Sequence, residues 1–255
     1  MSLVAGGGDI RIAAKDRPHH LVEARMHVVA TIEETAMSDE TETPESKLTR
    51  TKQEWASQGK FLTGRASRPE ADRLPPGQHL VQNWPILDLG LRPDTTPASF
   101  RLRVDGAVDA PALWDFPQLM AQKQTEAVSD IHCVTTWSRY DNRWSGVATS
   151  DLLETVRPKS GAAFVVLHCD DGYTTNLALA DFAAPGAMLV HAWEGRPLAS
   201  EHGGPVRLVV PHLYFWKSAK WLKRIEFRTK DEPGFWEVRG YHNRGDPWNE
   251  ERYSD

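Results

Sequence analysis

The stretch Ile131-His132-Cys133-Val134-Thr135-Thr136-Trp137-Ser138 decides how the rest of this 255-residue sequence is interpreted. Residues 130–134 form an apolar lead-in that is typical of a buried strand, and a polar run follows. We therefore expect Cys133 at the end of a strand, although most lone cysteines are buried and inert. Arg139 and Arg143 follow closely and favour a thiolate, which suits a soft or high-valent metal. The stretch predicts a thiol that is presented for reaction or for metal binding.

A second stretch, His202-Gly203-Gly204-Pro205-Val206-Arg207, predicts a turn whose backbone approaches a ligand, because glycine carries no side chain there. The planar guanidinium of Arg207 suits a phosphate or a heterocycle. Taken alone, this stretch is an ordinary turn beside a surface arginine. Lys217-Ser218-Ala219-Lys220 predicts the start of a short helix over residues 218–222, where N–H groups and positive charge bind anions. Together the two stretches indicate a site for a flat, phosphorylated organic cofactor.

The dipeptide His-Cys occurs twice, as His132-Cys133 and as His168-Cys169, which leaves a zinc site open. Adjacent residues on a strand point to opposite faces, and zinc ligands are normally separated by two to four residues, so zinc is the less favoured alternative. A disulfide between the two cysteines is also less favoured. Two cysteines are too few for a disulfide framework and fit a reducing, cytoplasmic compartment.

Composition excludes some classes of function. The net charge of −5 argues against nucleic acid as the main partner. No run of 18 apolar residues is present, so we expect no membrane span, and we recognise no signal peptide. The sequence also lacks G-x-G-x-x-G and P-loop motifs, which disfavours dinucleotides and nucleoside triphosphates.

The pattern of apolar residues predicts an α+β protein with a mixed sheet, because strands outnumber short helices. Strands are expected at residues 99–106, 130–134, 162–169, 173–179, 187–193, 206–210 and 224–228, and short helices at 115–120, 149–156 and 218–222. A single catalytic domain is predicted over residues 71–255. Residues 1–70 are expected to be a flexible, poorly ordered extension, since residues 38–46 are acidic and almost without apolar side chains. The polar end, residues 240–255, is predicted to be a surface extension.

The His-Cys-Val-Thr-x-Trp-Ser motif, followed by Trp144-Ser145-Gly146-Val147, resembles the sulfite-oxidase family of molybdenum enzymes. The resemblance extends over about residues 80–227 and is strongest to small stand-alone bacterial members. It implies the family's mixed-sheet molybdopterin-binding fold, a molybdenum–molybdopterin (Mo-molybdopterin) cofactor and oxygen-atom transfer. The substrate is then sulfite or a small S- or N-oxide. Because no haem-binding domain or C-x-x-C-H motif is recognised, electrons are expected to pass to or from a separate partner protein.

The resemblance also implies roles for individual residues. Cys133 is implied to be the protein ligand of molybdenum, with Tyr173 and Arg139 as catalytic side chains beside the substrate. The implied cofactor-binding residues are Asn83, Ile86, Leu87, Cys169, His202, Arg207, Ser218, Ala219 and Lys220. One departure concerns substrate: sulfite oxidases carry an arginine before the asparagine that Asn83 matches, whereas this sequence has Gln82. The missing charge weakens the case for sulfite, a dianion. A non-catalytic cofactor-binding or interaction module stays open as the alternative, as do the direction of transfer and the oligomeric state.

Overall fold

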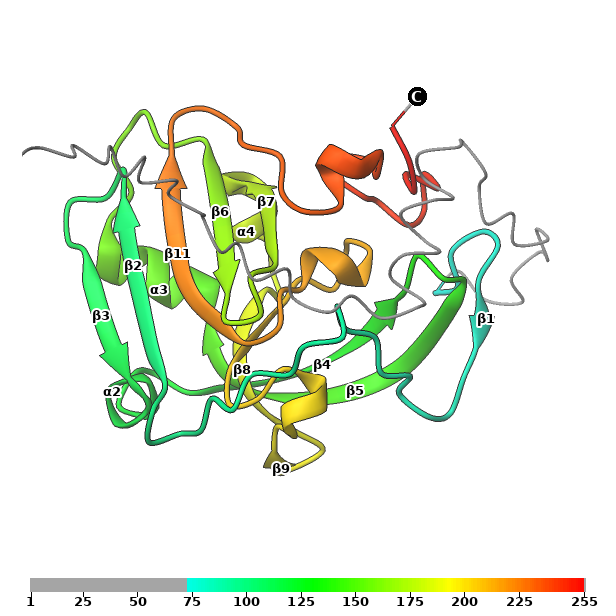
Figure 1. Ribbon diagram of the computed structural model, residues 1–255, viewed down its shortest axis with the longest axis horizontal. Helices are drawn as coiled ribbons and strands as arrows, with labels where there is room; N and C mark the ends of the chain where they lie inside the picture. Colours follow the sequence, from blue (N-terminus) through cyan, green and yellow to red (C-terminus); the bar gives the residue numbers. More distant parts are fainter. Residues whose placement is uncertain (1–72, 255) are drawn as a thin grey trace, which may run out of the picture. The chain divides into compact units, whose positions relative to one another are not determined.

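The computed structural model describes residues 73–254, whose strands form two sheets (Figure 1). The predicted extension, residues 1–70, lies outside the described residues, so that prediction stays a prediction. Among residues 73–254, no helix combines the length and apolar character that crossing a bilayer requires.

One sheet has five strands in the order β3-β2-β11-β6-β7. These strands are β3 (Ala112–Asp115), β2 (Arg101–Gly106), β11 (Leu222–Arg228), β6 (Phe164–Cys169) and β7 (Thr174–Ala178). Strand β11 pairs in parallel with β2, whereas the other pairs are antiparallel. The mixed sheet predicted from the sequence is therefore confirmed.

The second sheet has six strands. Four of them lie side by side in the order β1 (His79–Leu80), β5 (Trp137–Ala148), β8 (Met188–Trp193) and β10 (Arg207–Val209). Strand β4 (Thr125–His132) pairs with β5, and β9 (Arg196–Pro197) pairs with β8. Figure 1 shows β4 and β5 as a long hairpin. Where β5 pairs with β8 at a register shift, a Cβ on Gly146 would lie 2.0 Å from the Leu189 carbonyl oxygen, so only glycine allows this approach.

The helices are short. They are α2 (Phe116–Met120), α3 (Thr149–Val156), α4 (Leu179–Phe182) and the 3₁₀ turns η1 (Ser200–His202), η2 (Phe215–Lys217) and η3 (Glu237–Arg239). Helix α2 begins at a capping box, in which Asp115 accepts from the Gln118 amide and the Gln118 side chain accepts from the Asp115 amide. Helix α3 has the predicted bounds.

The helix predicted over residues 218–222 is wrong. The 3₁₀ turn η2 ends at Lys217, and the next element is β11. Ser218 and Ala219 instead run alongside β10: the Ser218 Oγ accepts from the Val210 amide at 2.9 Å, and the Ala219 carbonyl accepts from the Leu208 amide at 2.9 Å. These long-range bonds satisfy the backbone in an extended form, which the local residue pattern does not reveal.

The prediction of a surface extension over residues 240–255 is also wrong for the residues that the structure describes. Tyr241 and Arg252 are buried. Tyr241 packs edge-on against Trp216 at 5.1 Å between ring centroids, and Arg252 lies 5.1 Å from the Tyr214 ring centroid. Ring packing of this kind buries a segment whose sequence is otherwise polar.

The buried side chains form two hydrophobic clusters. One contains Cys169, Tyr173 and Ala219 together with the apolar faces of the five-stranded sheet. The other contains Cys133, Trp84, Trp137 and Tyr241. The two thiols therefore belong to different clusters, and both are free.

Candidate active site

A cavity is lined by segments that are far apart in the sequence. The loop between β1 and β2 contributes Trp84, Pro85, Ile86, Leu87, Asp88 and Leu89. The remaining lining residues are Cys133, Val134, Trp137, Asp171, Tyr173, Glu201, His202, Arg207, Phe215, Trp216, Ser218, Lys220, Trp236 and Tyr241. Strands β5 and β10 of the six-stranded sheet and the connections between strands of both sheets thus contribute to one pocket.

The thiol of Cys133 lies in the turn between β4 and β5, which confirms that it sits at a strand end. The turn is closed by the Cys133 amide, which donates to the Trp137 carbonyl at 2.8 Å, and by the Thr136 amide, which donates back to the Cys133 carbonyl at 3.0 Å. Thr136 has a φ of 75°, the left-handed region. The Sγ atom lies 3.1 Å from the Thr135 hydroxyl. These backbone bonds close the turn that carries the sulfur.

Arg207, the first residue of β10, is a buried cation. Its guanidinium donates to the carbonyls of His202 at 2.8 Å, Ser218 at 2.5 Å and Leu208 at 3.2 Å. Within residues 73–254 it forms no ion pair. Burial lowers the pKa of Arg207 to about 9. A buried charge that has only carbonyl partners is suited to receive an anion.

Lys220 brings a second cation to the same cavity. Its Nζ donates to the Glu201 carbonyl at 3.0 Å and lies 4.1 Å from the Trp221 ring centroid. Burial and then repulsion by Arg207 lower the pKa of Lys220 to about 7. Asp171 also lines the cavity, and burial raises the pKa of its carboxyl to about 6. Around neutral pH the charge of this end of the cavity is therefore sensitive to pH, because Lys220 and Asp171 both titrate there.

A flat wall is formed by Trp84 and His202, whose rings stack with centroids 3.9 Å apart and planes at 9°. Burial and the nearby charge of Arg207 lower the pKa of His202 to about 4, so its imidazole is neutral at pH 7. The Arg207 guanidinium lies 4.2 Å from the Phe215 ring centroid and 5.5 Å from that of Trp84. Stacked rings and a planar cation offer faces for a flat heterocycle.

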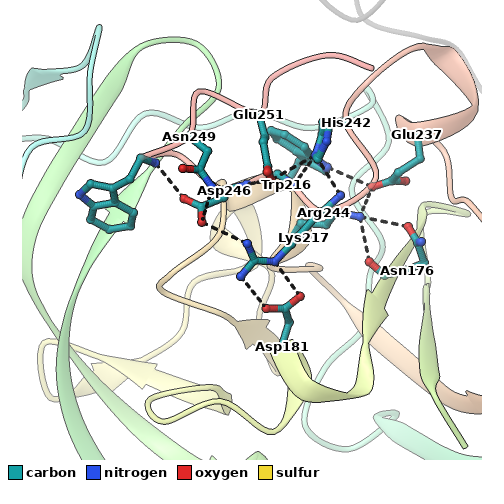
Figure 2. A network of polar contacts seen from close by, with 12 residues as sticks. Asn176, Asp181, Trp216, Lys217, Glu237, His242, Arg244, Asp246, Asn249 and Glu251 are labelled. Atoms are coloured by element: carbon teal, nitrogen blue, oxygen red, sulfur yellow. Dashed lines mark hydrogen bonds and ion pairs between the residues drawn. The ribbon is translucent and has the colours of Figure 1, made fainter. Parts of the chain in front are cut away.

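Another wall rests on a buried ion pair that Figure 2 shows at the centre of a polar network. The Lys217 Nζ lies 2.7 Å from a carboxylate oxygen of Glu237, and both side chains are almost fully buried. That same oxygen accepts from the Trp216 indole at 3.0 Å. The Trp216 carbonyl in turn accepts from the Tyr173 hydroxyl at 2.7 Å. Burial raises the pKa of Tyr173 well above its ordinary value, so the phenol keeps its proton.

Of the predicted site residues, the structure brings Cys133, Tyr173, Ile86, Leu87, His202, Arg207, Ser218 and Lys220 to the cavity. Asn83, Arg139, Cys169 and Ala219 are not among its lining residues. Arg139 donates to the Gln82 carbonyl at 3.3 Å and lies 4.8 Å from the Trp193 ring centroid. Cys169 and Ala219 are packed in the first cluster behind Arg207.

Sequence reasoning assigned no individual role to the aromatic lining, namely Trp84, Trp137, Phe215, Trp216, Trp236 and Tyr241, or to the carboxyl of Asp171. The ten tryptophans of the sequence were a signal that a ring-lined cleft exists. Their partners are distant in sequence, however, so residue order alone does not tell which tryptophans line the pocket.

The sequence left open a zinc site formed by the two His-Cys pairs. Across the described part of the chain, no group of three or more His, Cys, Asp or Glu side chains is placed to hold a metal ion. His132 instead bonds the Ser138 hydroxyl at 2.8 Å, and His168 bonds Glu226 at 3.1 Å. The two His-Cys pairs are therefore not assembled into a zinc site.

The chemistry of the cavity combines one thiol, the two cations Arg207 and Lys220, and flat aromatic walls. A thiol is a ligand for soft or high-valent metals, and the cations suit a phosphate. The walls suit a planar organic group. These donors fit a metal-carrying, phosphorylated heterocycle.

Comparison with known proteins identifies such a cofactor. A family model described as "Oxidoreductase molybdopterin binding domain" matches residues 89–236. The uncharacterized oxidoreductase YuiH of Bacillus subtilis is 47% identical over 188 residues, which cover 72% of this chain and 94% of YuiH. YedZ1 of Azospira oryzae, which is assigned as a protein-methionine-sulfoxide reductase subunit, is 33% identical over 146 residues. That match covers 57% of this chain and 55% of YedZ1.

Among solved structures, the sulfane dehydrogenase SoxCD from Paracoccus pantotrophus has a similar fold, with a TM-score of 0.53 and 20% identity. The likeness covers 57% of this chain and 42% of the SoxCD chain. The family model and the identity to YuiH are each sufficient to assign the family. This chain belongs to the sulfite-oxidase-like family of molybdopterin-binding oxidoreductases.

Proposed function

We propose that this chain catalyses oxygen-atom transfer to or from a small S- or N-oxide, at a molybdenum atom whose protein ligand is Cys133. The observation that carries the proposal is the common cavity of the Cys133 thiol, the buried cation Arg207 and the half-buried cation Lys220. A thiol at one part of the cavity and positive charge at another match the metal and the phosphate of a single cofactor.

In this proposal each part of the cofactor has its own residues. Cys133 holds the metal, and Arg207, Lys220 and Ser218 hold the phosphate. Ile86, Leu87 and His202 contact the pterin, and Asn83, Cys169 and Ala219 stay predicted contacts. When bound, the cofactor supplies the two-electron redox chemistry. The domain that carries it is proposed to be residues 71–255.

The residues around the thiol exclude water and orient the substrate. Val134, Trp137 and Tyr241 line the cavity together with Cys133, so the surroundings of the thiol are largely apolar. The Tyr173 hydroxyl is proposed to lie near the substrate oxygen, and its donation to the Trp216 carbonyl fixes where the phenol points. Arg139 remains a proposed substrate-orienting residue. With Gln82 before Asn83, the site favours a neutral oxide over the sulfite dianion.

Electrons are proposed to pass to or from a separate protein. The assignment of YedZ1 as a subunit supports this arrangement.

The test compares Cys133→Ser with the wild-type chain, both made in a host that synthesises the molybdenum cofactor. We expect equimolar molybdenum in the wild type, and turnover of a sulfoxide or an N-oxide with an artificial electron donor. Turnover should be lost in Cys133→Ser, because a hydroxyl is a poor substitute for a thiolate on such a metal. Elemental analysis and dye-linked assays provide the two measurements.

The control is Val128→Ala, which changes an exposed side chain on the strand that leads to the same turn. Its metal content and turnover should match the wild type. Full turnover in Cys133→Ser would refute the ligand assignment. Stoichiometric molybdenum without turnover of any oxide or of sulfite would favour the non-catalytic cofactor-binding module.

A further inference from the structure

The segment over residues 237–254 begins where the family match ends, at residue 236, and returns to the cavity. Figure 1 shows it in orange to red, after β11. Its residue Tyr241 lines the cavity together with Cys133. A segment outside the matched domain thus forms part of the site.

The C-terminal segment is attached along its length. The Tyr214 amide donates to the Gly245 carbonyl at 2.7 Å, and Arg244 forms an ion pair with Asp181 at 3.2 Å (Figure 2). Gly245 packs so closely that a Cβ there would lie 2.6 Å from the Trp216 ring. These contacts hold the segment against the aromatic wall of the cavity.

Arg252 is the part of the segment that reaches the thiol-bearing turn. The residue is 7% exposed, and its Nη1 donates to the Val134 carbonyl at 2.9 Å while its Nη2 donates to the Pro76 carbonyl at 3.2 Å. Val134 is the residue directly after Cys133. The guanidinium therefore ties the turn to the loop before β1.

A second bond holds the neighbouring peptide unit of the turn. The Gln78 side-chain amide donates to the Cys133 carbonyl at 3.1 Å. The carbonyls of Cys133 and Val134 are thus both fixed by side chains from other parts of the chain. Since Thr136 also adopts a left-handed φ of 75°, the turn depends on outside bonds to keep its shape.

We propose that Arg252 is a positioning residue that fixes the Cys133 turn so that the thiol meets its metal in one orientation. The proposal rests on the proposed function, because it assumes that Cys133 is the ligand. A guanidinium is required since its planar fork reaches two carbonyls in two segments, which a single ammonium group cannot match. Residues that orient a metal ligand without touching the metal are a recurrent need of metal sites.

The experiment compares Arg252→Met, Arg252→Lys and the control Arg239→Met in the full, cofactor-loaded chain. Arg239 belongs to the same segment and also donates to a carbonyl, that of Phe235 at 2.8 Å, with its guanidinium 3.8 Å from the Phe235 ring centroid. Neither Arg239 nor Phe235 lines the cavity. The control therefore removes similar contacts at a place away from the thiol.

For Arg252→Met we expect kcat or molybdenum per chain to fall by about tenfold or more, the range found for residues that orient metal ligands. KM should stay within about twofold of the wild type, because the change leaves direct substrate contacts intact. Arg252→Lys should recover part of the loss, and Arg239→Met should behave as the wild type. Amide hydrogen exchange of the peptide over residues 131–138 should quicken in Arg252→Met alone.

Unchanged kcat, molybdenum content and exchange in a folded Arg252→Met would overturn the proposal. So would an equal loss in Arg239→Met, which would indicate general weakening of the segment. The Cys133→Ser variant distinguishes failure of the proposed function from failure of the proposed role of Arg252. If Cys133→Ser retains turnover, the proposed function fails, whereas loss in Cys133→Ser with a normal Arg252→Met rejects only the role of Arg252.

Discussion

At the scale of single residues, the main feature of the site is a pair of cationic side chains that are largely shielded from water. Arg207 is buried among carbonyls, and Lys220 lies beside it in the same cavity. Both side chains lose affinity for the proton through burial, and their mutual repulsion adds to the effect for Lys220. Such a pair opposes folding of the empty chain and favours binding of an anion.

The destabilising effect of the Lys220 charge should appear in the pH dependence of the free energy of unfolding. Its pKa is about 7 in the folded chain, below the ordinary value of 10.5. Between these values the unfolded chain binds more protons, so the free energy of unfolding should rise with pH, by up to about 1.4 kcal/mol per pH unit. Urea titrations of the cofactor-free chain from pH 7 to 9.5 measure this slope.

Lys220→Met supplies the comparison, because it removes the titrating group. The difference in unfolding free energy between the two proteins should shrink or change sign as pH rises. The proposed phosphate beside Lys220 would restore its affinity for the proton in the cofactor-loaded chain, so the pH-dependent difference should disappear there. An identical slope in the wild type and in Lys220→Met would contradict the assignment of the cost to this residue.

At the scale of elements, the sequence predicted those whose pattern is local. Helix α3 has the predicted bounds, and β6, β7 and β8 each lie within a predicted strand. Strand β5 was missed because it mixes buried and exposed residues without alternation, a consequence of pairing with β4, β8 and β1 at once. The false helix at residues 218–222 arose because serine and lysine suggested a helix start, whereas β10 holds that segment extended.

The same distinction applies to the site. Motifs indicated the residues that carry unusual chemistry, such as Cys133 and Arg207, and the structure places both at the cavity. They did not indicate Trp236 or Tyr241, because an aromatic residue becomes part of a pocket only through partners brought near by folding. Contacts between residues that are far apart in the sequence could therefore not be predicted from the motifs.

The close pairing of β5 with β8 at Gly146 leads to a prediction about stability. Gly146→Ala should lower the free energy of unfolding by several kcal/mol, because its Cβ would lie 2.0 Å from the Leu189 carbonyl oxygen and the strands must separate. Gly161→Ala serves as the control, since a Cβ there meets only the Thr229 methyl at 3.6 Å. Urea unfolding measures both, and equal stability of the two variants would refute the steric argument.

At the scale of the whole molecule, the buried pair of Lys217 and Glu237 joins parts of the chain that are distant in sequence. Lys217 also donates to the Asn176 carbonyl on β7 at 2.9 Å (Figure 2). Glu237 accepts from the Thr175 hydroxyl at 2.8 Å. The pair therefore connects η2, the five-stranded sheet and the C-terminal segment. Removing one partner leaves the other charge buried without compensation.

Lys217→Met should accordingly destabilise the chain by about 3–5 kcal/mol. The double variant Lys217→Met/Glu237→Gln should recover much of the loss, because no net charge then remains buried. Urea unfolding provides the free energies. Lys123→Met is the control: Lys123 pairs with Asp151 at 2.9 Å but its side chain is 75% exposed, so its removal should leave the stability close to that of the wild type. Additive losses in the double variant would contradict the pairing.

The place of β11 in its sheet has a consequence for how the protein is made. This strand, Leu222–Arg228, inserts between β2 and β6, which precede it in the chain by many residues. During translation, the edge of β2 that pairs with β11 therefore stays unpaired until residue 228 has left the ribosome exit tunnel. Unpaired strand edges attract other chains. The nascent protein thus needs chaperone cover until β11 has paired with β2 and β6.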